Sequence, residues 1–381
     1  MKILTADIGT GTQDIFLFDS QLGVENGFKL IVPSPTMIVH QRVKAASLEG
    51  KAILLTGSIM GGGPSHWAVQ EHLQHGFSVY ATPDAARTFN DDLAAVQAMG
   101  VQIIGQDEAI NLPSDIERIE LKDFDFDLIA RTFAGFNINI QDLDLLAIAV
   151  FDHGNAPANV SDRKFRFDYL DERIRETGKL SAFAYLAEDI PEKMTRLRTA
   201  AQSAVEFQGP MVMMDTAPAA VLGALLDVND LDNQDLMVAN LGNMHTLAFR
   251  ISNNRVEGLF EHHTGELSAE QLDGLLIRLA DGTLRNEDVY DHHGHGALML
   301  NTDPMKFQES AYPLLATGPR RRLLVDSKLK VSFAAPFGDM MITGCLGLLA
   351  AAADLLPDYR EEILEALDQG KDMKTAPWEI S

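Results

Sequence analysis

An aspartate followed by a turn of glycines and threonines lies near the start of the chain. The apolar segment 2–7 ends at Asp7, and the turn residues that follow are Gly9, Thr10, Gly11 and Thr12. Glycines let backbone N–H groups approach an anion closely, and threonine hydroxyls add hydrogen-bond donors. The Asp7 carboxylate offers the oxygen ligand that Mg²⁺ prefers. The segment therefore predicts a phosphate-binding turn with Asp7 as the catalytic magnesium ligand; the alternative is an aspartate that only caps the turn.

A similar strand, turn and returning strand occur again in the second half of the chain. The residues that would contact phosphate there are Asn240, Gly242, Asn243, His245 and Thr246. The order of the two units, about one in each half, predicts two similar domains that face each other across a cleft. We place these domains at residues 1–208 and 209–381.

Asp152 and His153 stand at the end of the apolar segment 145–151 and form a candidate acid/base pair. A carboxylate beside an imidazole can tune the pKa and the tautomer of that imidazole. Because adjacent strand residues point in opposite directions, we expect only one of the two side chains to face the cleft. Asp215 ends another apolar segment, where it either orients a nucleophile or caps the helix that follows.

Five of the eleven histidines lie in two short segments. With His245 and nearby acidic residues they offer ligands for Zn²⁺, Mn²⁺ or Fe²⁺, and they are His262, His263, His292, His293 and His295. Their spacing matches no standard zinc motif. The alternatives are a contact between one imidazole and a phosphate, or exposure of the clustered histidines in a glycine-rich loop.

The elements that must position these residues follow from hydrophobic periodicity. Predicted strands are 2–7, 13–19, 28–32, 36–43, 52–57, 77–81, 101–104, 145–151, 211–215, 236–240, 246–251, 256–260 and 340–342. Predicted helices are 66–75, 83–99, 181–207 with an interruption near Pro191, 217–226 and 345–355. Strands alternating with helices predict an α/β protein.

Three further segments carry weaker signals. The glycine-rich residues 56–65 follow a strand and either line the substrate side of the cleft or make a tight connection. Asp123, Asp125 and Asp127 alternate with phenylalanine, as expected for the solvated face of a strand. The three arginines at 320–322 are expected to pair with surface acids.

Composition narrows the possible partners and compartment. The 381 residues carry a net charge of −24, which argues against nucleic acid and anionic membranes as partners. The absence of a signal-like or membrane-spanning apolar run leads us to expect a cytoplasmic protein. The single cysteine, Cys345, leaves no partner for a disulfide and no set of thiolates for an iron–sulfur cluster.

Taken together, the two turns resemble the phosphate loops of the actin/hexokinase/chaperone-ATPase superfamily. The segment 214–223 resembles its connecting helix, and Gly344 and Gly347 lie where its adenosine motif is expected. The resemblance implies two ribonuclease-H-like lobes around a central cleft that binds Mg-ATP. The implied function is a small-molecule kinase or an ATPase, with Asp215 orienting the nucleophile.

The chain departs from that superfamily at Asn240, where chaperone ATPases have aspartate, and in its glycine-poor adenosine motif. These departures favour a second hypothesis, a non-catalytic clamp that senses a nucleotide or metabolite. A third is a metal-dependent hydrolase that uses the histidine loops. More narrowly, residues 240–246 and 261–265 resemble a family whose names refer to pyruvate formate-lyase activation. A radical activating enzyme needs three cysteines for its cluster, so we do not carry that activity over.

Overall fold

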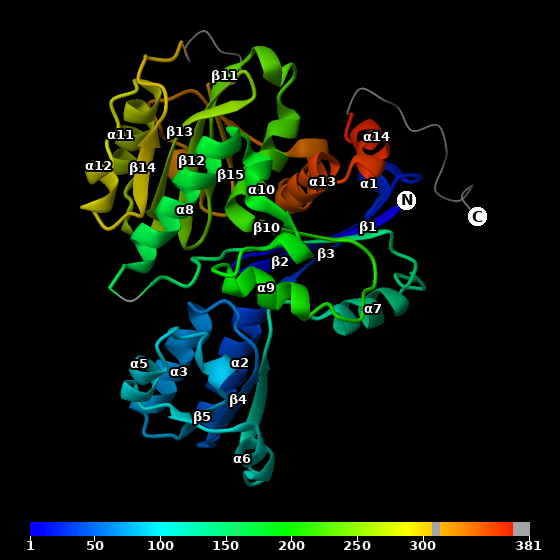
Figure 1. Cartoon of the computed structure of the whole chain (residues 1–381), viewed down its shortest axis with the longest axis vertical. Helices are drawn as coiled ribbons and strands as arrows, with labels where there is room; N and C mark the ends of the chain where they lie inside the picture. The colour runs from blue at the N-terminus through cyan, green and yellow to red at the C-terminus, as the bar shows by residue number, and fades with distance from the viewer. Residues whose placement is uncertain (158, 307–312, 369–381) are drawn as a thin grey trace.

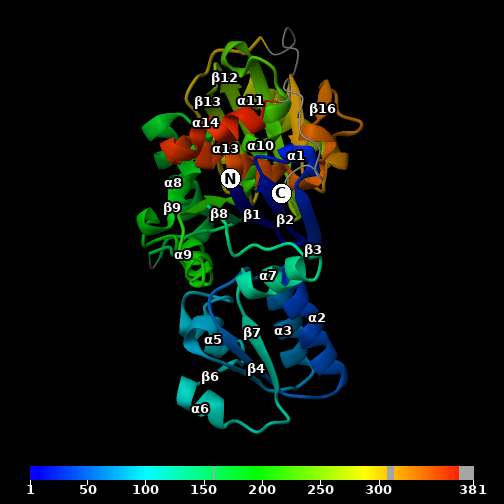
Figure 2. The ribbon, with the colours of Figure 1, turned by 90° about the vertical axis from the view of Figure 1, so that its right-hand side faces the viewer.

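The computed structural model describes residues 1–157, 159–306 and 313–368. Within these ranges the strands form three sheets. Two of the sheets stack in one body, and the third lies in a separate body beneath it (Figures 1 and 2).

The first sheet has the strand order β3-β2-β1-β8-β10-β9. Its strands are β1 (Lys2–Ile8), β2 (Thr12–Asp19), β3 (Phe28–Pro33), β8 (Leu145–Val150), β9 (Ala184–Leu186) and β10 (Met211–Asp215). Strands β1, β2 and β3 form an antiparallel meander, and β8 and β10 continue the sheet in parallel with β1. All six residues of β8 are buried, as expected for a strand covered on both faces.

The second sheet has the order β14-β13-β12-β11-β15-β16. Its strands are β11 (Asp235–Leu241), β12 (His245–Ser252), β13 (Arg255–His263), β14 (Gly296–Met299), β15 (Leu314–Thr317) and β16 (Val331–Phe333). The meander of three strands followed by two parallel strands repeats the arrangement of the first sheet. The predicted α/β fold of two ribonuclease-H-like lobes is therefore confirmed.

Two helices lie between the sheets, α10 (Thr216–Ala224) and α13 (Thr343–Leu355) (Figure 1). Helix α13 packs on β1 and β8 of the first sheet, and α10 packs on β11 and β15 of the second. The two helices cross at Gly223 and Gly347, where a Cβ on Gly347 would lie 1.8 Å from the carbonyl oxygen of Ala219. Glycine at this crossing lets the two backbones touch and joins the cores of both lobes into one.

An inserted α/β domain, which the sequence reasoning did not separate, interrupts the first lobe between β3 and β8. Its parallel sheet has the order β6-β5-β4-β7, with its own hydrophobic core. Its strands are β4 (Ile53–Gly57), β5 (Val79–Ala81), β6 (Gln102–Ile103) and β7 (Glu117–Leu121). Its helices are α2 (Pro35–Leu48), α3 (Pro64–Gln74), α4 (Pro83–Ala86), α5 (Leu93–Ala98) and α6 (Gln106–Asn111).

The remaining helices cover the two lobes. They are α1 (Gly23–Asn26), α7 (Phe126–Ala134), α8 (Asp162–Thr177), α9 (Thr195–Gln202), α11 (Ala269–Ala280), α12 (Glu287–Tyr290) and α14 (Pro357–Ala366). None of the helices in the described part of the chain is long and apolar enough to cross a membrane.

Several local predictions were wrong. Residues 36–43 are in α2 instead of a strand, because Ser34 caps Met37 N–H and Pro35 starts the helix. Residues 83–99 form two short helices, 181–207 contain β9 and α9, and 340–342 form a 3₁₀ turn. The domain boundary at 208 falls just before β10, which belongs to the first sheet.

The aspartates at 123–127 do not share a solvated strand face. Asp125 caps α7 by accepting a hydrogen bond from Leu128 N–H, and Asp123 is buried in an ion pair with Arg196. The helical periodicity that starts at Phe126 overrides the alternation of the preceding residues.

Candidate functional site

The predicted turns in the two lobes have the same backbone geometry. Gly9 follows β1, and its N–H donates to the carbonyl of Thr12 at 3.0 Å. Gly242 follows β11, and its N–H donates to the carbonyl of His245 at 2.9 Å. The two turns are thus equivalent positions of the repeated lobe, and Asp7 corresponds to Asn240.

The repeat extends to the residues behind each turn. Ser34, after β3, donates its N–H to the Gly11 carbonyl at 3.1 Å, and Thr264, after β13, donates to the Met244 carbonyl at 2.8 Å. These bonds occupy carbonyl oxygens of the turns, which would otherwise repel an anion. Each turn is therefore built as expected for an anion-binding turn.

The two turns meet at one cleft. Gly11 approaches the Asn243 side chain so closely that a Cβ on this glycine would lie 2.8 Å from Nδ2. The cleft has a volume of about 1040 Å³. Its lining includes most of the predicted site: Asp7, Gly9, Thr10, Gly11, Thr12, Asp152, His153, Asn240, Gly242, Asn243, His245 and Gly344.

The inserted domain forms a further wall of the cleft. Residues 59–63 of the glycine-rich segment and residues 87–92 line it. Two of the lining residues are arginines, Arg87 and Arg196. Arg196 is held in place by Asp123, with its Nε 2.7 Å from Oδ2. Arg87 brings positive charge to the cleft, whereas the Asp123 carboxylate balances the charge of Arg196.

Asp7 has a carboxylate neighbour that the sequence reasoning missed. Asp14 lies directly opposite Asp7 on β2, so both side chains lie on one face of the sheet and line the cleft. Burial raises the pKa of each carboxyl from 3.8 to about 7, and the like charge of Asp7 contributes to the shift at Asp14. In the predicted hairpin of the first two strands, alternation of side chains along β2 could have indicated that Asp14 shares a face with Asp7.

The two carboxylates differ in their partners. Asp7 accepts a hydrogen bond from the Thr216 hydroxyl at 2.5 Å and packs against Gly344 in the first turn of α13. The N-terminal end of that helix carries partial positive charge, which favours the ionised form. Asp14 Oδ1 is buried with no hydrogen-bond partner among the described residues. Two adjacent carboxylates with an unsatisfied oxygen fit an Mg²⁺ ion, which takes oxygen ligands.

Two carboxylates predicted to act as acid or base make hydrogen bonds within the protein instead. Asp152 lines the cleft, yet its two oxygens accept hydrogen bonds from the N–H groups of Gly154 and Leu197. Asp215 is buried away from the cleft lining, caps Ala217 N–H, and pairs with Arg166 at 2.5 Å. The catalytic prediction for Asp215 is therefore wrong, because a buried ion pair occupies its side chain.

Arg166, which the sequence reasoning also missed, joins the two sheets. Its Nε lies 3.2 Å from Glu261 on β13, and both side chains are fully buried. Burial raises the pKa of Glu261 from 4.5 to about 7. An arginine on the apolar face of α8, next to Phe167 and Leu170, is the signal that could have revealed this pair.

Two predicted cofactor contacts have packing roles instead. The Thr246 hydroxyl is buried against that of Thr264 at 3.0 Å, and it lies outside the cleft lining. Gly347 belongs to the crossing of α10 and α13, one helical turn beyond the cleft residue Gly344.

The histidines divide into two groups. His153, His245, His263 and His295 form a cluster, with the ring centroid of His263 5.0 Å from that of His245 and 4.7 Å from that of His295. His292 and His293 are exposed, and His262 points to the other face of β13, as alternation along a strand requires. The metal prediction is therefore wrong for His262, His292 and His293.

Burial favours the neutral form of the clustered imidazoles. Burial lowers the pKa of His153 to about 3 and that of His295 to about 2, and neighbouring positive groups add to both shifts. Burial lowers the pKa of His245 well below its usual value. A neutral imidazole keeps a lone pair on one ring nitrogen, which can bind a metal ion, and an N–H on the other, which can donate to a phosphate.

Comparisons with solved structures give distant matches. An acetate kinase from Entamoeba histolytica is 9% identical, with 67% of this chain and 55% of that chain covered and a TM-score of 0.24. MreB5 of Spiroplasma citri bound to ADP is 10% identical, with 95% and 98% covered and a TM-score of 0.34. A hexokinase of the ROK type from Thermus thermophilus is 13% identical, with 98% and 91% covered and a TM-score of 0.23.

These scores are too low to carry an argument, so the fold assignment rests on the repeated strand order of the chain itself. The chain spans about half the length of the acetate kinase. No curated protein matches the sequence. One family model matches residues 60–323, which is more than half of the 381 residues. The chain therefore belongs to the family described as "Putative pyruvate format-lyase activating enzyme (DUF1786)".

Proposed function

We propose that the cleft binds a magnesium nucleotide, with ATP as the leading candidate, and supports transfer of its terminal phosphoryl group to a small molecule or to water. One observation carries the proposal: equivalent glycine turns, one from each lobe, meet at a cleft beside the paired carboxylates of Asp7 and Asp14. Such turns bind phosphate oxygens through backbone N–H groups.

Asp7 and Asp14 would hold the magnesium ion, which supplies neutralisation of the phosphate charge when bound. Phosphoryl transfer depends on positioning and on charge stabilisation more than on covalent help from the protein. Arg87 also lines the cleft, where its guanidinium group would stabilise further negative charge. Gly344 lies at the start of α13 and leaves room for a ligand and for the Asp7 carboxylate together.

A non-catalytic clamp is the second candidate, and a specific observation favours it. Both oxygens of Asp152 and both of Asp215 are hydrogen-bonded within the protein, so neither carboxylate is free to act as a general base. The position equivalent to Asp7 in the second lobe is the neutral Asn240. Binding would then change the lobe arrangement without turnover.

The activity named in the family description is not proposed. A radical activating enzyme needs a cluster held by cysteine thiolates. This sequence has one cysteine, and Cys345 is buried with Sγ 3.0 Å from the carbonyl oxygen of Asp14.

The test is thermal unfolding of the full chain with a panel of nucleoside mono-, di- and triphosphates, each with and without Mg²⁺. We expect stabilisation by at least one nucleotide only when Mg²⁺ is present. Asp7→Asn should lose this stabilisation and keep the native circular dichroism spectrum, whereas the exposed Asp84→Asn should keep both.

Release of phosphate from any nucleotide that binds then separates the two candidates. Turnover in the native chain that Asp7→Asn lacks supports phosphoryl transfer, and binding without turnover selects the clamp. If none of the nucleotides stabilises the chain, phosphoryl transfer from a nucleotide and a nucleotide-sensing clamp both fail.

A further inference from the structure

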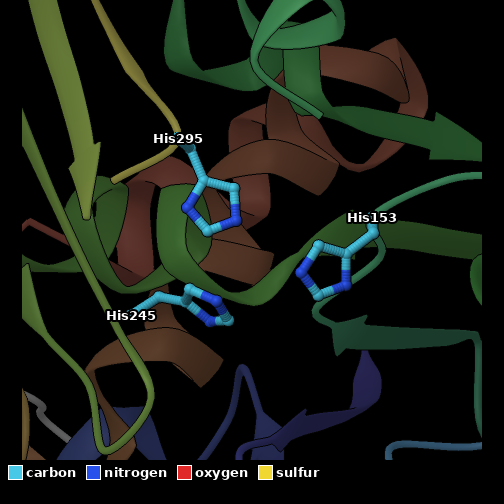
Figure 3. A group of neighbouring side chains, drawn as sticks. All are labelled: His153, His245 and His295. Atoms are coloured by element: carbon cyan, nitrogen blue, oxygen red, sulfur yellow. The ribbon is translucent and has the colours of Figure 1, made fainter. Parts of the chain in front are cut away.

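Three histidines that are distant in the sequence converge at the wall of the cleft (Figure 3). His153 follows β8 of the first lobe, whereas His245 starts β12 and His295 precedes β14, both in the second lobe. One ring nitrogen from each histidine lies within 4.8 Å of one nitrogen from each of the others. Figure 3 shows the three rings turned towards a common centre.

These rings have nitrogens that the protein leaves unsatisfied. Both ring nitrogens of His295, a residue 1% exposed, are buried with no hydrogen-bond partner in the described part of the chain. The same holds for Nε2 of His245. Burying polar nitrogens without a partner opposes folding unless another group binds them. A ligand that accepts one lone pair from each of several imidazoles would remove this cost.

We propose that His153, His245 and His295 bind one divalent transition-metal ion of the zinc class. Imidazole nitrogen suits Zn²⁺, Fe²⁺, Ni²⁺ and Cu²⁺, whereas Mg²⁺ and Ca²⁺ prefer oxygen ligands. This site is therefore distinct in its chemistry from the pair of carboxylates at Asp7 and Asp14. It does not depend on the proposed nucleotide.

Three protein ligands leave a tetrahedral ion with one open position. His153 and His245 line the cleft while His295 lies behind them, so the open position is on the cleft side. Water or an oxygen atom of a cleft ligand would fill it.

The site also joins the two lobes. A zinc–nitrogen bond of about 2.0–2.1 Å places two tetrahedral ligand nitrogens about 3.4 Å apart. A bound ion would therefore link His153 of the first lobe to the two histidines of the second lobe. Phe151 supports the arrangement, because its ring stacks on His245 at 4.2 Å and Arg166 lies 4.4 Å from its centroid.

The experiment is a zinc titration of the chelator-treated full chain without nucleotide, in competition with a chromophoric zinc chelator. We expect about one ion per chain, as three converging ligands predict. Each of the variants H153N, H245N and H295N should weaken binding at least about 10-fold, since loss of a supporting residue alone costs 10–100-fold. The matched controls H292N and H293N remove exposed histidines outside the cluster and should bind zinc as the native chain does.

The visible spectrum of the Co²⁺-loaded chain gives a second readout that needs no variant. A four-coordinate site with nitrogen ligands should produce intense visible bands, and the spectrum of hydrated Co²⁺ would overturn the proposal. Absence of stoichiometric zinc, or equal weakening by H292N and H295N, would overturn it as well. Stabilisation of H295N by a magnesium nucleotide is measured in parallel, so failure of the metal site and failure of the nucleotide site are told apart.

Discussion

Replacement of Asp14 by asparagine should make the ligand-free protein more stable at alkaline pH. Asp14 lies opposite Asp7, and burial with this like charge raises its pKa from 3.8 to about 7. An ionised carboxylate in this position opposes folding, because the unfolded chain hydrates the same charge freely. Asparagine has the same shape and no charge, so the variant removes this destabilisation of the folded state.

The magnitude follows from the shift. A pKa that is about three units higher in the folded state corresponds to about 4 kcal/mol at pH above 7, at 1.36 kcal/mol per unit. The side chain is partly exposed to the cleft, which reduces the expected gain to about 2 kcal/mol at pH 8. The cost of ionising Asp14 in the folded chain is absent below pH 3.8, the pKa in the unfolded chain. It grows until the pH passes about 7, the pKa in the folded chain, so about half of the gain is expected at pH 5.5.

Urea denaturation of the native and Asp14→Asn chains, without divalent ions, measures the gain in unfolding free energy at pH 5.5 and at pH 8. Asp84→Asn is the control, because it removes an exposed carboxylate from the first turn of α4. The variant should also lose the stabilisation by magnesium nucleotide. An Asp14→Asn chain that is less stable than the native chain at pH 8, or whose gain does not rise with pH, would refute this reasoning.

The crossing of α10 and α13 predicts that Gly347→Ala loses about 3 kcal/mol of unfolding free energy or more, because the new Cβ meets the Ala219 carbonyl. Gly274→Ala, in the open interior of α11, should instead gain about 0.5–1 kcal/mol, and urea denaturation compares the two; equal effects would contradict the packing account. Arg166→Met should lose about 3–5 kcal/mol at pH 8, since it leaves two carboxylates buried without their cation. The loss should shrink at pH 5.5, because Glu261, with a pKa of about 7, is then protonated. A loss that does not change with pH would show that packing alone is responsible.

The repeated turn could be predicted from the sequence because its signals are local. A buried strand, glycines and a returning strand lie within about a dozen residues at Asp7 and again at Asn240. Such short-range patterns fix the turn and the direction of the chain. Their occurrence in both halves was enough to predict two similar lobes around a cleft.

The composition of the histidine cluster depends on one extra residue. The hairpin of β12 and β13 turns at Asn253 and Asn254, and regular pairing from that turn would place His245 opposite His262. A bulge between Arg250 and Ile251 shifts the register, so that His263 lies opposite His245. A shift of one residue exchanges the faces of a strand, and no turn residue announces this bulge.

The inserted domain was hidden for another reason. Its strands and helices alternate as those of the lobes do, so this alternation does not mark its ends. The β-branched residues in 36–43 favoured a strand, while the Ser34-Pro35 start signal for a helix was overlooked. The sequence of α8 could reveal that Arg166 is buried, but its pairing with Glu261 depends on the packing of the two lobes and has no local signal.

The most direct test of the central claim is a crystal structure of the full chain with Mg²⁺ and the best-binding nucleotide. The account predicts the phosphates between the turns at residues 9–12 and 242–245, with the magnesium ion next to Asp7 and Asp14. A nucleotide bound elsewhere on the molecule, or phosphates that contact only one of the two turns, would contradict it.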